Sequence, residues 1–315
     1  MKVAVVGAGA MGSLFGGLLA EAGAEVWLID IWAAHVDAVN KHGLEVEREG
    51  RTRAIRLQAT TDPETISNCD LVIVFVKSTH TGDATLTAKS IAGPQGLVLT
   101  LQNGMGNADR IAQDVDPLNV IAGTTSYGAT MLGPGKIRHA GVGLTTIGMW
   151  HNGEAEKAEK VAAFFSEAGI QTEVAADVRS IVWGKLLINV GINAITALTG
   201  IKNGELLDLE ATIALSQAAV EEAVRVAEAQ DIDVRKDVVD HVLEVARATG
   251  KNRSSMGQDV DNKRLTEIKA INGVVVKEAE RLGIPAPVNH TLTALVETLQ
   301  AHYKENIVIK AEEIK

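Results

Sequence analysis

The stretch KVAVVGAGAMGSLFGGLLAEAGAEVWLID, residues 2–30, decides the fold class. It begins with an apolar run, continues through glycines at positions 7, 9 and 12, and enters an Ala- and Leu-rich segment. A second apolar run then ends at Asp30. A strand, a glycine turn, a helix and a second strand in this order are typical of parallel strands joined by a crossover helix. The sequence therefore opens with a β-α-β unit.

The glycine spacing in this unit is that of a Rossmann-type dinucleotide-binding turn. The first glycine permits the turn, the second lets a pyrophosphate approach the backbone, and the third packs the helix against the strand. Because the helix amino terminus then faces the phosphates, the residues expected to contact them are Gly7, Gly9, Ala10, Met11 and Gly12. The alternative is an ordinary strand-to-helix turn that binds no ligand.

Asp30 favours NADH over NADPH. It lies 18 residues beyond Gly12, where an acidic side chain accepts hydrogen bonds from the adenosine ribose and repels a 2′-phosphate. No Arg or Lys follows within DIWAAHVDAVN to offset that repulsion. A solvent-facing Asp at the end of a strand is the alternative interpretation.

The rest of the chain predicts an α/β fold, with a Rossmann-type, mostly parallel sheet domain (1–175) followed by an all-α C-terminal domain (176–315). Continuous apolar runs indicate buried parallel strands at 2–7, 25–30, 71–77 and 96–103. Helical patterns in this first part cover 11–22, 33–42 and 79–91. An antiparallel hairpin is expected at 44–60 around Gly50, and the Gly-rich region 120–149 is expected to complete the sheet. Long helical periodicity follows at 177–198, 210–230, 235–248, 261–282 and 288–303.

Lys77 and Asn103 end two of the predicted strands. The carboxyl ends of the strands are where an open α/β sheet binds its ligands, so both side chains are candidates for the site. Asn103 is followed by Gly104 and is also suited to starting a turn. Lys77 could equally be a strand-end charge that reaches water.

Composition excludes several function classes. The net charge of -10, without any block of Lys and Arg, argues against a nucleic-acid partner. Met1 leads directly into a strand, and no run of about 18 uncharged apolar residues occurs, so we expect a cytoplasmic protein with no membrane span. Cys69 is the single cysteine and is interpreted as structural, and the scattered histidines predict no metal site.

The segment WGKLLINVGINAI, residues 183–195, carries one polar row on an apolar helix. Lys185, Asn189 and Asn193 are each four residues apart, which places them on one helical face. Polar groups held beside a core are costly unless something binds them, and that partner is either protein or a substrate. Taken singly, such a Lys often reaches solvent and such asparagines often bridge helices.

Five motifs in order resemble those of the ketopantoate reductase, or 2-dehydropantoate 2-reductase, family: GAGAMG, VFVK, LQNGMGN, WGKLLINVGIN and NRSSMGQDVDNKRLTEIKAINGVV. The resemblance covers nearly the whole chain. It implies reduction of 2-dehydropantoate to (R)-pantoate by NAD(P)H, on the route to pantothenate.

The same resemblance implies roles for single residues. Lys185 takes the place of the catalytic lysine, and Asn189 and Asn193 those of the substrate-binding asparagines. Ser255 matches the serine that binds the substrate carboxylate, although the SSM segment would also suit a helix N-cap. By the same matching, Glu267 completes the catalytic site and Asn103 lies near nicotinamide and substrate.

The chemistry suits these residue types. Hydride arriving at a ketone carbon makes an alkoxide, so a cationic donor at that oxygen stabilises the charge and supplies the proton. Lys185 can do both, and Glu267 is the candidate for orienting it. We expect burial to lower the pKa of Lys185 and the carboxylate to raise it.

Asp30 departs from the better-known family members, which favour NADPH and carry an Arg or a neutral residue there. The segment around it looks closer to a branch of NADH-preferring D-2-hydroxyacid dehydrogenases that act on mandelate-like or branched-chain substrates. A small 2-keto acid is expected as substrate in either case. A non-catalytic NAD-binding sensor is the third hypothesis, and a homodimer is expected from the family and from the frequency of symmetric dimers.

Overall fold

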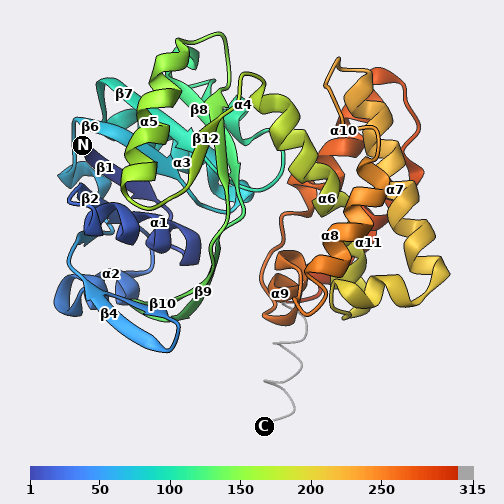
Figure 1. Cartoon of the computed structure of the whole chain (residues 1–315), viewed down its shortest axis with the longest axis horizontal. Helices are drawn as coiled ribbons and strands as arrows, with labels where there is room; N and C mark the ends of the chain where they lie inside the picture. Colours follow the sequence, from blue (N-terminus) through green and yellow to red (C-terminus); the bar gives the residue numbers. More distant parts are fainter. Residues whose placement is uncertain (304–315) are drawn as a thin grey trace. The chain divides into compact units, whose positions relative to one another are not determined.

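The computed structural model describes residues 1–303, which form two compact units (Figure 1). The first, here called the α/β unit, comprises Met1–Gln102 and Gly106–Ile181. The second, here called the helical unit, comprises Asn103–Met105 and the chain from Val182 onward. The part of the charged C-terminal tail beyond residue 303 lies outside the described residues.

An eight-stranded sheet forms the centre of the α/β unit. Six parallel strands run in the order β5 (Gln58–Thr60), β2 (Glu25–Ile29), β1 (Lys2–Val6), β6 (Cys69–Val74), β7 (Ala92–Thr100) and β8 (Val120–Thr125). β11 (Thr145–Met149) is antiparallel to β8, and β12 (Thr172–Val174) runs parallel to β11. The central strands are buried on both faces, which explains their continuous apolar sequence. The fold is therefore the predicted α/β arrangement with a mostly parallel sheet.

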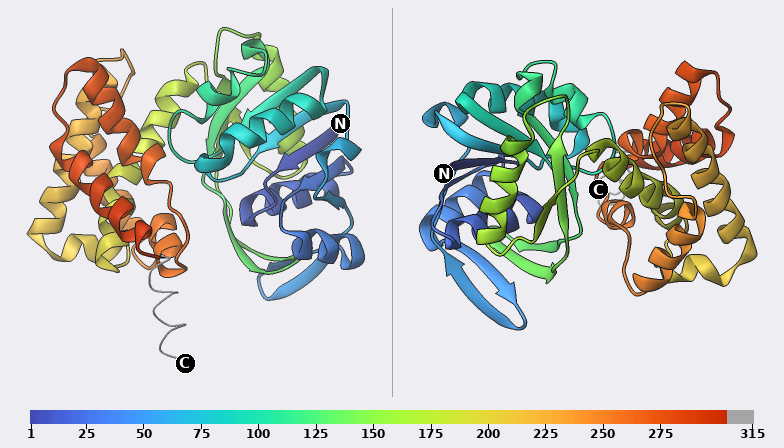
Figure 2. Two further views of the ribbon diagram at one scale, coloured as in Figure 1. Left: turned by 180° about the vertical axis from the view of Figure 1, so that it is seen from behind. Right: turned by 45° about the horizontal axis from the view of Figure 1, so that its top comes forward.

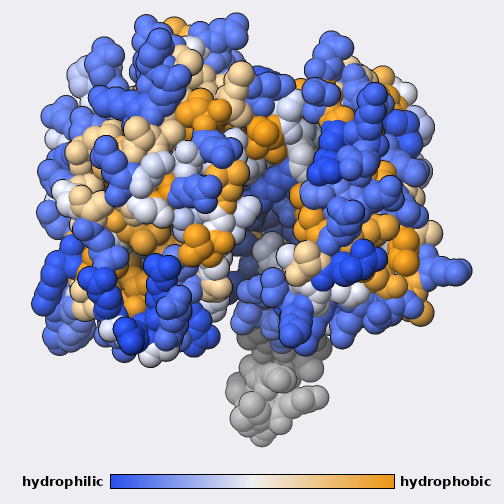
Figure 3. Space-filling view, viewed as in Figure 1, coloured by the Kyte–Doolittle hydropathy of each residue, from blue (hydrophilic) through white to orange (hydrophobic). Residues whose placement is uncertain are grey.

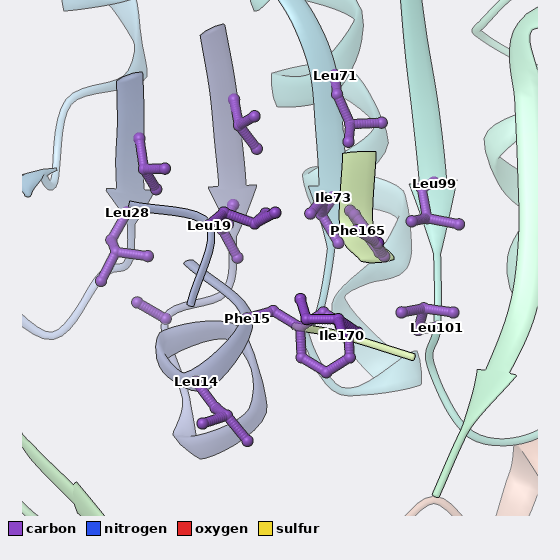
Figure 4. Packing of buried hydrophobic residues seen from close by; sticks show 14 of the residues in the cluster. Leu14, Phe15, Leu19, Leu28, Leu71, Ile73, Leu99, Leu101, Phe165 and Ile170 are labelled. Carbon is purple, nitrogen blue, oxygen red and sulfur yellow. The ribbon is translucent and has the colours of Figure 1, made fainter. Parts of the chain in front are cut away.

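Helices cover both faces of this sheet (Figure 2). α1 (Ala10–Glu21) and α5 (Ala155–Glu167) share one face, where the ring centroids of Phe15 and Phe165 lie 5.9 Å apart. Figure 4 shows these rings with Leu19 and Ile170 over the strand residues Ile73 and Leu99. The opposite face is covered by α3 (Thr81–Ile91). This core fixes α1, and with it the glycine turn that precedes it.

A second sheet of four strands packs beside α1 and α2 (Ala33–His42). Its order is β4 (Arg51–Ile55), β3 (Leu44–Arg48), β10 (Lys136–Gly141) and β9 (Gly128–Gly133). β3 and β4 form the expected hairpin, with positive φ at Glu49 and Gly50. The expectation that all of 120–149 completes the main sheet is wrong for β9 and β10. They pair with the hairpin instead, because β3 offers an edge that β10 joins in parallel.

The helical unit contains α6 (Val178–Thr199, which begins in the α/β unit), α7 (Glu210–Glu228), α8 (Val238–Ala248), α9 (Ser255–Asp261), α10 (Asn272–Leu282) and α11 (Pro287–Ala301). The continuous helix predicted at 261–282 is wrong. α9 ends at Asp261, Lys263 has a φ of 52°, and a short 3-10 turn at Ile268–Ala270 precedes α10. Periodicity did not detect this break because apolar residues continue at helical spacing across it.

α6 is the core helix of the helical unit. Among the described residues it alone has the length and apolar composition to cross a bilayer, but 67% of its apolar window is buried inside the protein. The apolar stripe on α7 likewise packs internally, through Ala219, Val220 and Ala223. Figure 3 shows hydrophobic residues interspersed with hydrophilic ones on the viewed face. Leu209 and Leu295 are among the leucines with large exposed fractions.

Candidate active site

The glycine turn between β1 and α1 has the geometry that an approaching phosphate requires. Gly7 has a φ of 98°, and a Cβ there would lie 2.6 Å from the backbone N of Val76. A Cβ on Gly12 would lie 2.0 Å from the carbonyl O of Gly7, so α1 could not pack as closely against the turn. Around Gly9, by contrast, the space that a Cβ would occupy is open. Gly7 and Gly12 therefore permit the tight turn, and Gly9 leaves open space on its outer side for a ligand to approach the backbone.

The start of α1 is suited to an anion. Gly9 is the N-cap and contributes no side chain, and the first turn carries no acidic residue. The backbone N–H groups at Ala10 and Met11 begin the helix, where the helix dipole favours negative charge. These residues fit the pyrophosphate of a dinucleotide.

Asp30 and Lys77 follow parallel strands at the carboxyl edge of the sheet. Asp30 comes directly after β2, and its Oδ1 accepts a hydrogen bond of 3.0 Å from the backbone N–H of Trp32. Lys77 is exposed and lies beyond β6, which ends at Val74 rather than at residue 77. Asp30 and Lys77 thus lie at the edge of the sheet where open α/β folds bind their ligands.

Lys185 lies on α6 in the helical unit and is half-buried among apolar neighbours. Burial lowers the pKa of its ammonium from 10.5 to about 8, and the carboxylate of Glu267 opposes that fall. Glu267 is itself buried, with 6% of its surface exposed. The structure therefore places a cation of lowered pKa within the field of a buried carboxylate.

Asn103 reaches this pair through a short segment that belongs to the helical unit. Its Nδ2 lies 3.5 Å from Oε2 of Glu267, to which it donates. The backbone N–H of Met105 donates to the carbonyl O of Ala270 at 2.9 Å. A Cβ on Gly104 would lie only 2.3 Å from that same oxygen, and Gly104 has a φ of 83°. Gly104 thus allows Asn103 to lie beside Glu267.

Asn193 and Ser255 form a second contact along α6. Nδ2 of Asn193 lies 3.5 Å from Oγ of Ser255, and Ser255 is exposed at the start of α9. The N-cap of α9 is Ser254, whose Oγ accepts from the backbone N–H of Gly257 at 3.0 Å. The two serines therefore divide the two roles between them: Ser254 caps the helix and Ser255 faces the polar row. Asn189 is half-buried on the same helix, between Lys185 and Asn193.

Sequence reasoning missed Arg253, which links α9 to the C-terminal end of α6. Its guanidinium donates to the carbonyl oxygen of Thr196 in the last turn of α6 and to that of Ile201 just after the helix, and it pairs with Asp261 of α9 at 2.8 Å. A Cβ on Gly257 would lie 2.6 Å from the guanidinium. The Arg and Gly that flank the SSM segment were the available signal. Arg253 holds α9, and hence Ser255, against α6.

The helical unit thus supplies a cationic donor, a carboxylate, three carboxamides and a hydroxyl. A lysine with a pKa about 8 exchanges protons near neutral pH, and neutral donors can bind a carboxylate or a carbonyl without further charge. The α/β unit supplies a turn that fits a dinucleotide. The fold and these groups define the class: a Rossmann-type dinucleotide-binding protein with the side chains for acid catalysis.

Comparison with known proteins identifies the family. The family model described as ketopantoate reductase PanE/ApbA matches residues 3–152, and the model of its C-terminal domain matches residues 177–300. A 2-dehydropantoate 2-reductase from Halobacterium salinarum is 42% identical over 95% of this chain and 99% of that protein. The chain belongs to the ketopantoate reductase family.

Solved structures agree with this assignment. A PanE/ApbA family ketopantoate reductase from Ralstonia eutropha JMP134 is similar with a TM-score of 0.89 and 36% identity, covering 96% of this chain and 100% of that one. A D-mandelate dehydrogenase solved with NADH and anilino(oxo)acetate is similar with a TM-score of 0.90 and 29% identity, covering 96% and 99%. A ketopantoate reductase and a D-mandelate dehydrogenase therefore share this fold.

Proposed function

We propose that this protein catalyses the NAD(P)H-dependent reduction of 2-dehydropantoate to (R)-pantoate, a step of pantothenate biosynthesis, with Lys185 as the general acid. The observation that carries the proposal is the environment of Lys185, whose pKa is lowered to about 8 by burial beside Glu267. Family membership and the names of the curated relatives support the choice of substrate.

A reduced nicotinamide, when bound, would supply the hydride to the ketone carbon. Nζ of Lys185 donates a proton to the ketone oxygen, which stabilises the negative charge as it develops and completes the alcohol. Glu267 orients the ammonium and keeps its pKa from falling further. Lys185 regains its proton from solvent after the product leaves.

The remaining polar groups of the helical unit bind the substrate. Ser255 and Asn193 hold the carboxylate end, and Asn189 and Asn103 contact the carbonyl and hydroxyl groups. These are neutral donors, so they fix the keto acid without competing with Lys185 for the developing charge.

The glycine turn at Gly7–Gly12 and Lys77 would bind the phosphates of the cofactor, and Asn103 and Glu267 would contact its nicotinamide. Asp30 accepts hydrogen bonds from the adenosine ribose and repels a 2′-phosphate, so NADH is preferred. In this assignment residues 1–175 form the dinucleotide-binding domain and residues 176–315 the substrate domain.

A second candidate keeps the mechanism and changes the substrate. The likeness to a D-mandelate dehydrogenase solved with NADH, together with Asp30, favours a D-2-hydroxyacid dehydrogenase acting on an aryl or branched 2-keto acid. A non-catalytic NAD sensor has no use for a lysine of lowered pKa. For the assembly, a cytoplasmic homodimer is proposed.

Initial rates test the proposal. The purified protein is assayed with 2-dehydropantoate, phenylglyoxylate and a branched-chain 2-keto acid, each with NADH and with NADPH. The highest kcat/KM is expected for 2-dehydropantoate with NADH. A clear preference for phenylglyoxylate or the branched keto acid would transfer the mechanism to the second candidate. The absence of any turnover, with NADH bound, would favour the sensor.

A further inference from the structure

His35 on α2 is fully buried, and the catalytic scheme does not use it. It lies in the α/β unit, five residues beyond Asp30. A buried imidazole needs partners for both ring nitrogens, and here each one has a partner from a different element.

The hydrogen bonds fix a single tautomer. The backbone N–H of Gly135 donates to Nδ1 of His35 at 3.0 Å, so Nδ1 carries the lone pair and Nε2 carries the proton. Nε2 then donates to Oγ of Ser13 at 3.3 Å, and Ser13 donates onward to the carbonyl O of Ala8 at 2.8 Å. The chain of bonds therefore runs from the β9–β10 turn to Ala8 inside the glycine turn.

Both ends of this series of hydrogen bonds are sterically constrained. Ala8 lies between Gly7 and Gly9, and Ser13 is fully buried in the first turns of α1. At the other end Gly135 has a φ of 69°, and a Cβ there would lie 2.8 Å from Cβ of Ala38 on α2. The second sheet thus presents one backbone N–H to His35 at close range.

The imidazole also supports the segment that follows Asp30. The Trp32 ring stacks on His35 with centroids 5.5 Å apart and planes 16° apart. The backbone N–H of Trp32 is the donor to Asp30, and its carbonyl O accepts from the backbone N–H of His35 at 2.9 Å. One buried ring is therefore tied to the phosphate side of the site through Ser13 and to the ribose side through Trp32.

We propose that His35 is a positioning residue for the dinucleotide: in its neutral Nε2–H form it holds the glycine turn and the Asp30–Trp32 segment in the arrangement that binds NADH. The inference rests on the proposed dinucleotide function. It gives the second sheet a role, because Gly135 selects the tautomer that can reach Ser13.

The charge around the ring favours this neutral form. Burial lowers the pKa of His35, and Asp30 raises it by less. Other ionisable side chains on the surrounding elements are Asp37, Lys41 and His42 on α2, Glu21 at the far end of α1, Glu45, Glu47 and Arg48 on β3, and Lys136, Arg138 and His139 on β10. Protonation would place an N–H opposite the N–H of Gly135 and break that bond. NADH affinity is therefore expected to be constant between pH 7 and 8 and to weaken on acidification.

The test measures NADH affinity by fluorescence titration, alongside steady-state rates and thermal stability. His35→Leu removes both hydrogen bonds, and Ser13→Ala removes the link to Ala8. His35→Gln retains a neutral donor near the position of Nε2. Thr145→Val is the matched control, because Thr145 is fully buried in the same unit and donates to Oγ1 of Thr125 at 2.9 Å.

His35→Leu and Ser13→Ala are each expected to raise the Kd and KM for NADH about tenfold, with kcat at saturating NADH and the keto-acid KM changed by less than about twofold. His35→Gln should recover most of the affinity and lose the decline on acidification. Thr145→Val should lower the Tm and leave the Kd unchanged. Equal Kd values in wild type and His35→Leu, or a Kd rise of the same size in Thr145→Val, would overturn the inference. A wild-type protein that binds no dinucleotide would instead overturn the proposed function, and His35 would then have nothing to position.

Discussion

Replacing Glu267 by Gln should move the alkaline limb of the pH–rate profile to lower pH. In the wild-type protein the pKa of Lys185 is lowered to about 8 by burial, against the opposing effect of Glu267. A general acid must be protonated to act, so with Lys185 in that role kcat/KM for keto-acid reduction is expected to fall as pH rises through that value. Glu267→Gln removes the negative charge and keeps an amide oxygen that can accept from Asn103.

The size of the shift follows from the loss of one nearby opposite charge, which typically moves a pKa by about one unit or more. If the pKa of Lys185 falls to about 7, its protonated fraction at pH 8 falls from about one half to about one tenth. The variant should therefore lose about fivefold in kcat/KM at pH 8 from this cause, and much less at pH 6.

The assay is the initial rate of NADH oxidation with the preferred keto acid between pH 6 and 9.5. Glu297→Gln serves as the control, since Glu297 is a carboxylate of the helical unit paired with Lys269 at 3.4 Å. Its profile should match the wild type. An alkaline limb that stays at the wild-type pH in Glu267→Gln, or one that moves to higher pH, would refute the assignment of that limb to Lys185.

Three further changes test other parts of the site. Asp30→Asn keeps an oxygen that can accept from the backbone N–H of Trp32 and removes the negative charge that would repel a 2′-phosphate. The ratio of kcat/KM with NADPH to that with NADH should therefore rise about tenfold or more. Ser254→Ala removes an N-cap and should cost about 1 kcal/mol in denaturant unfolding, whereas Ser255→Ala should keep its stability and raise the keto-acid KM. Equal changes in unfolding free energy and in keto-acid KM for Ser254→Ala and Ser255→Ala would contradict the separate roles of the two serines. Gly104→Ala places a Cβ 2.3 Å from the carbonyl of Ala270 and should lower both stability and kcat. A Gly104→Ala variant with wild-type kcat would show that the segment carrying Asn103 is not held in this way.

The sheet of the α/β unit could be predicted because its strands leave a strong signal. β1, the run 71–74 of β6 and the second half of β7 are buried on both faces, so their sequences are almost continuously apolar. The glycine turn could be predicted because its three positions have distinct steric requirements, which Gly7, Gly9 and Gly12 meet in the structure. The sequence alone predicts a feature when the residue types it requires are set by neighbouring residues in the chain.

Other features depend on partners far away in the sequence. β10 could not be assigned to the second sheet, because its parallel partner β3 lies about 90 residues earlier in the chain and neither strand encodes the pairing. The contact of Gly104 with Ala270 and the bond of Gly135 to His35 are likewise long-range. Gly104 and Gly135 are therefore required by contacts with residues far away in the sequence, and those contacts are seen only in the folded structure.

The measurement that tests the central claim most directly compares wild type with Lys185→Met. The rate of NADH oxidation with 2-dehydropantoate and the Kd for NADH are determined on the same preparations. Met fills a similar volume without a proton to donate, so kcat should fall by about 10²-fold or more while the Kd for NADH stays within about twofold. Turnover by Lys185→Met at the wild-type rate would contradict the account, because some other group would then supply the proton.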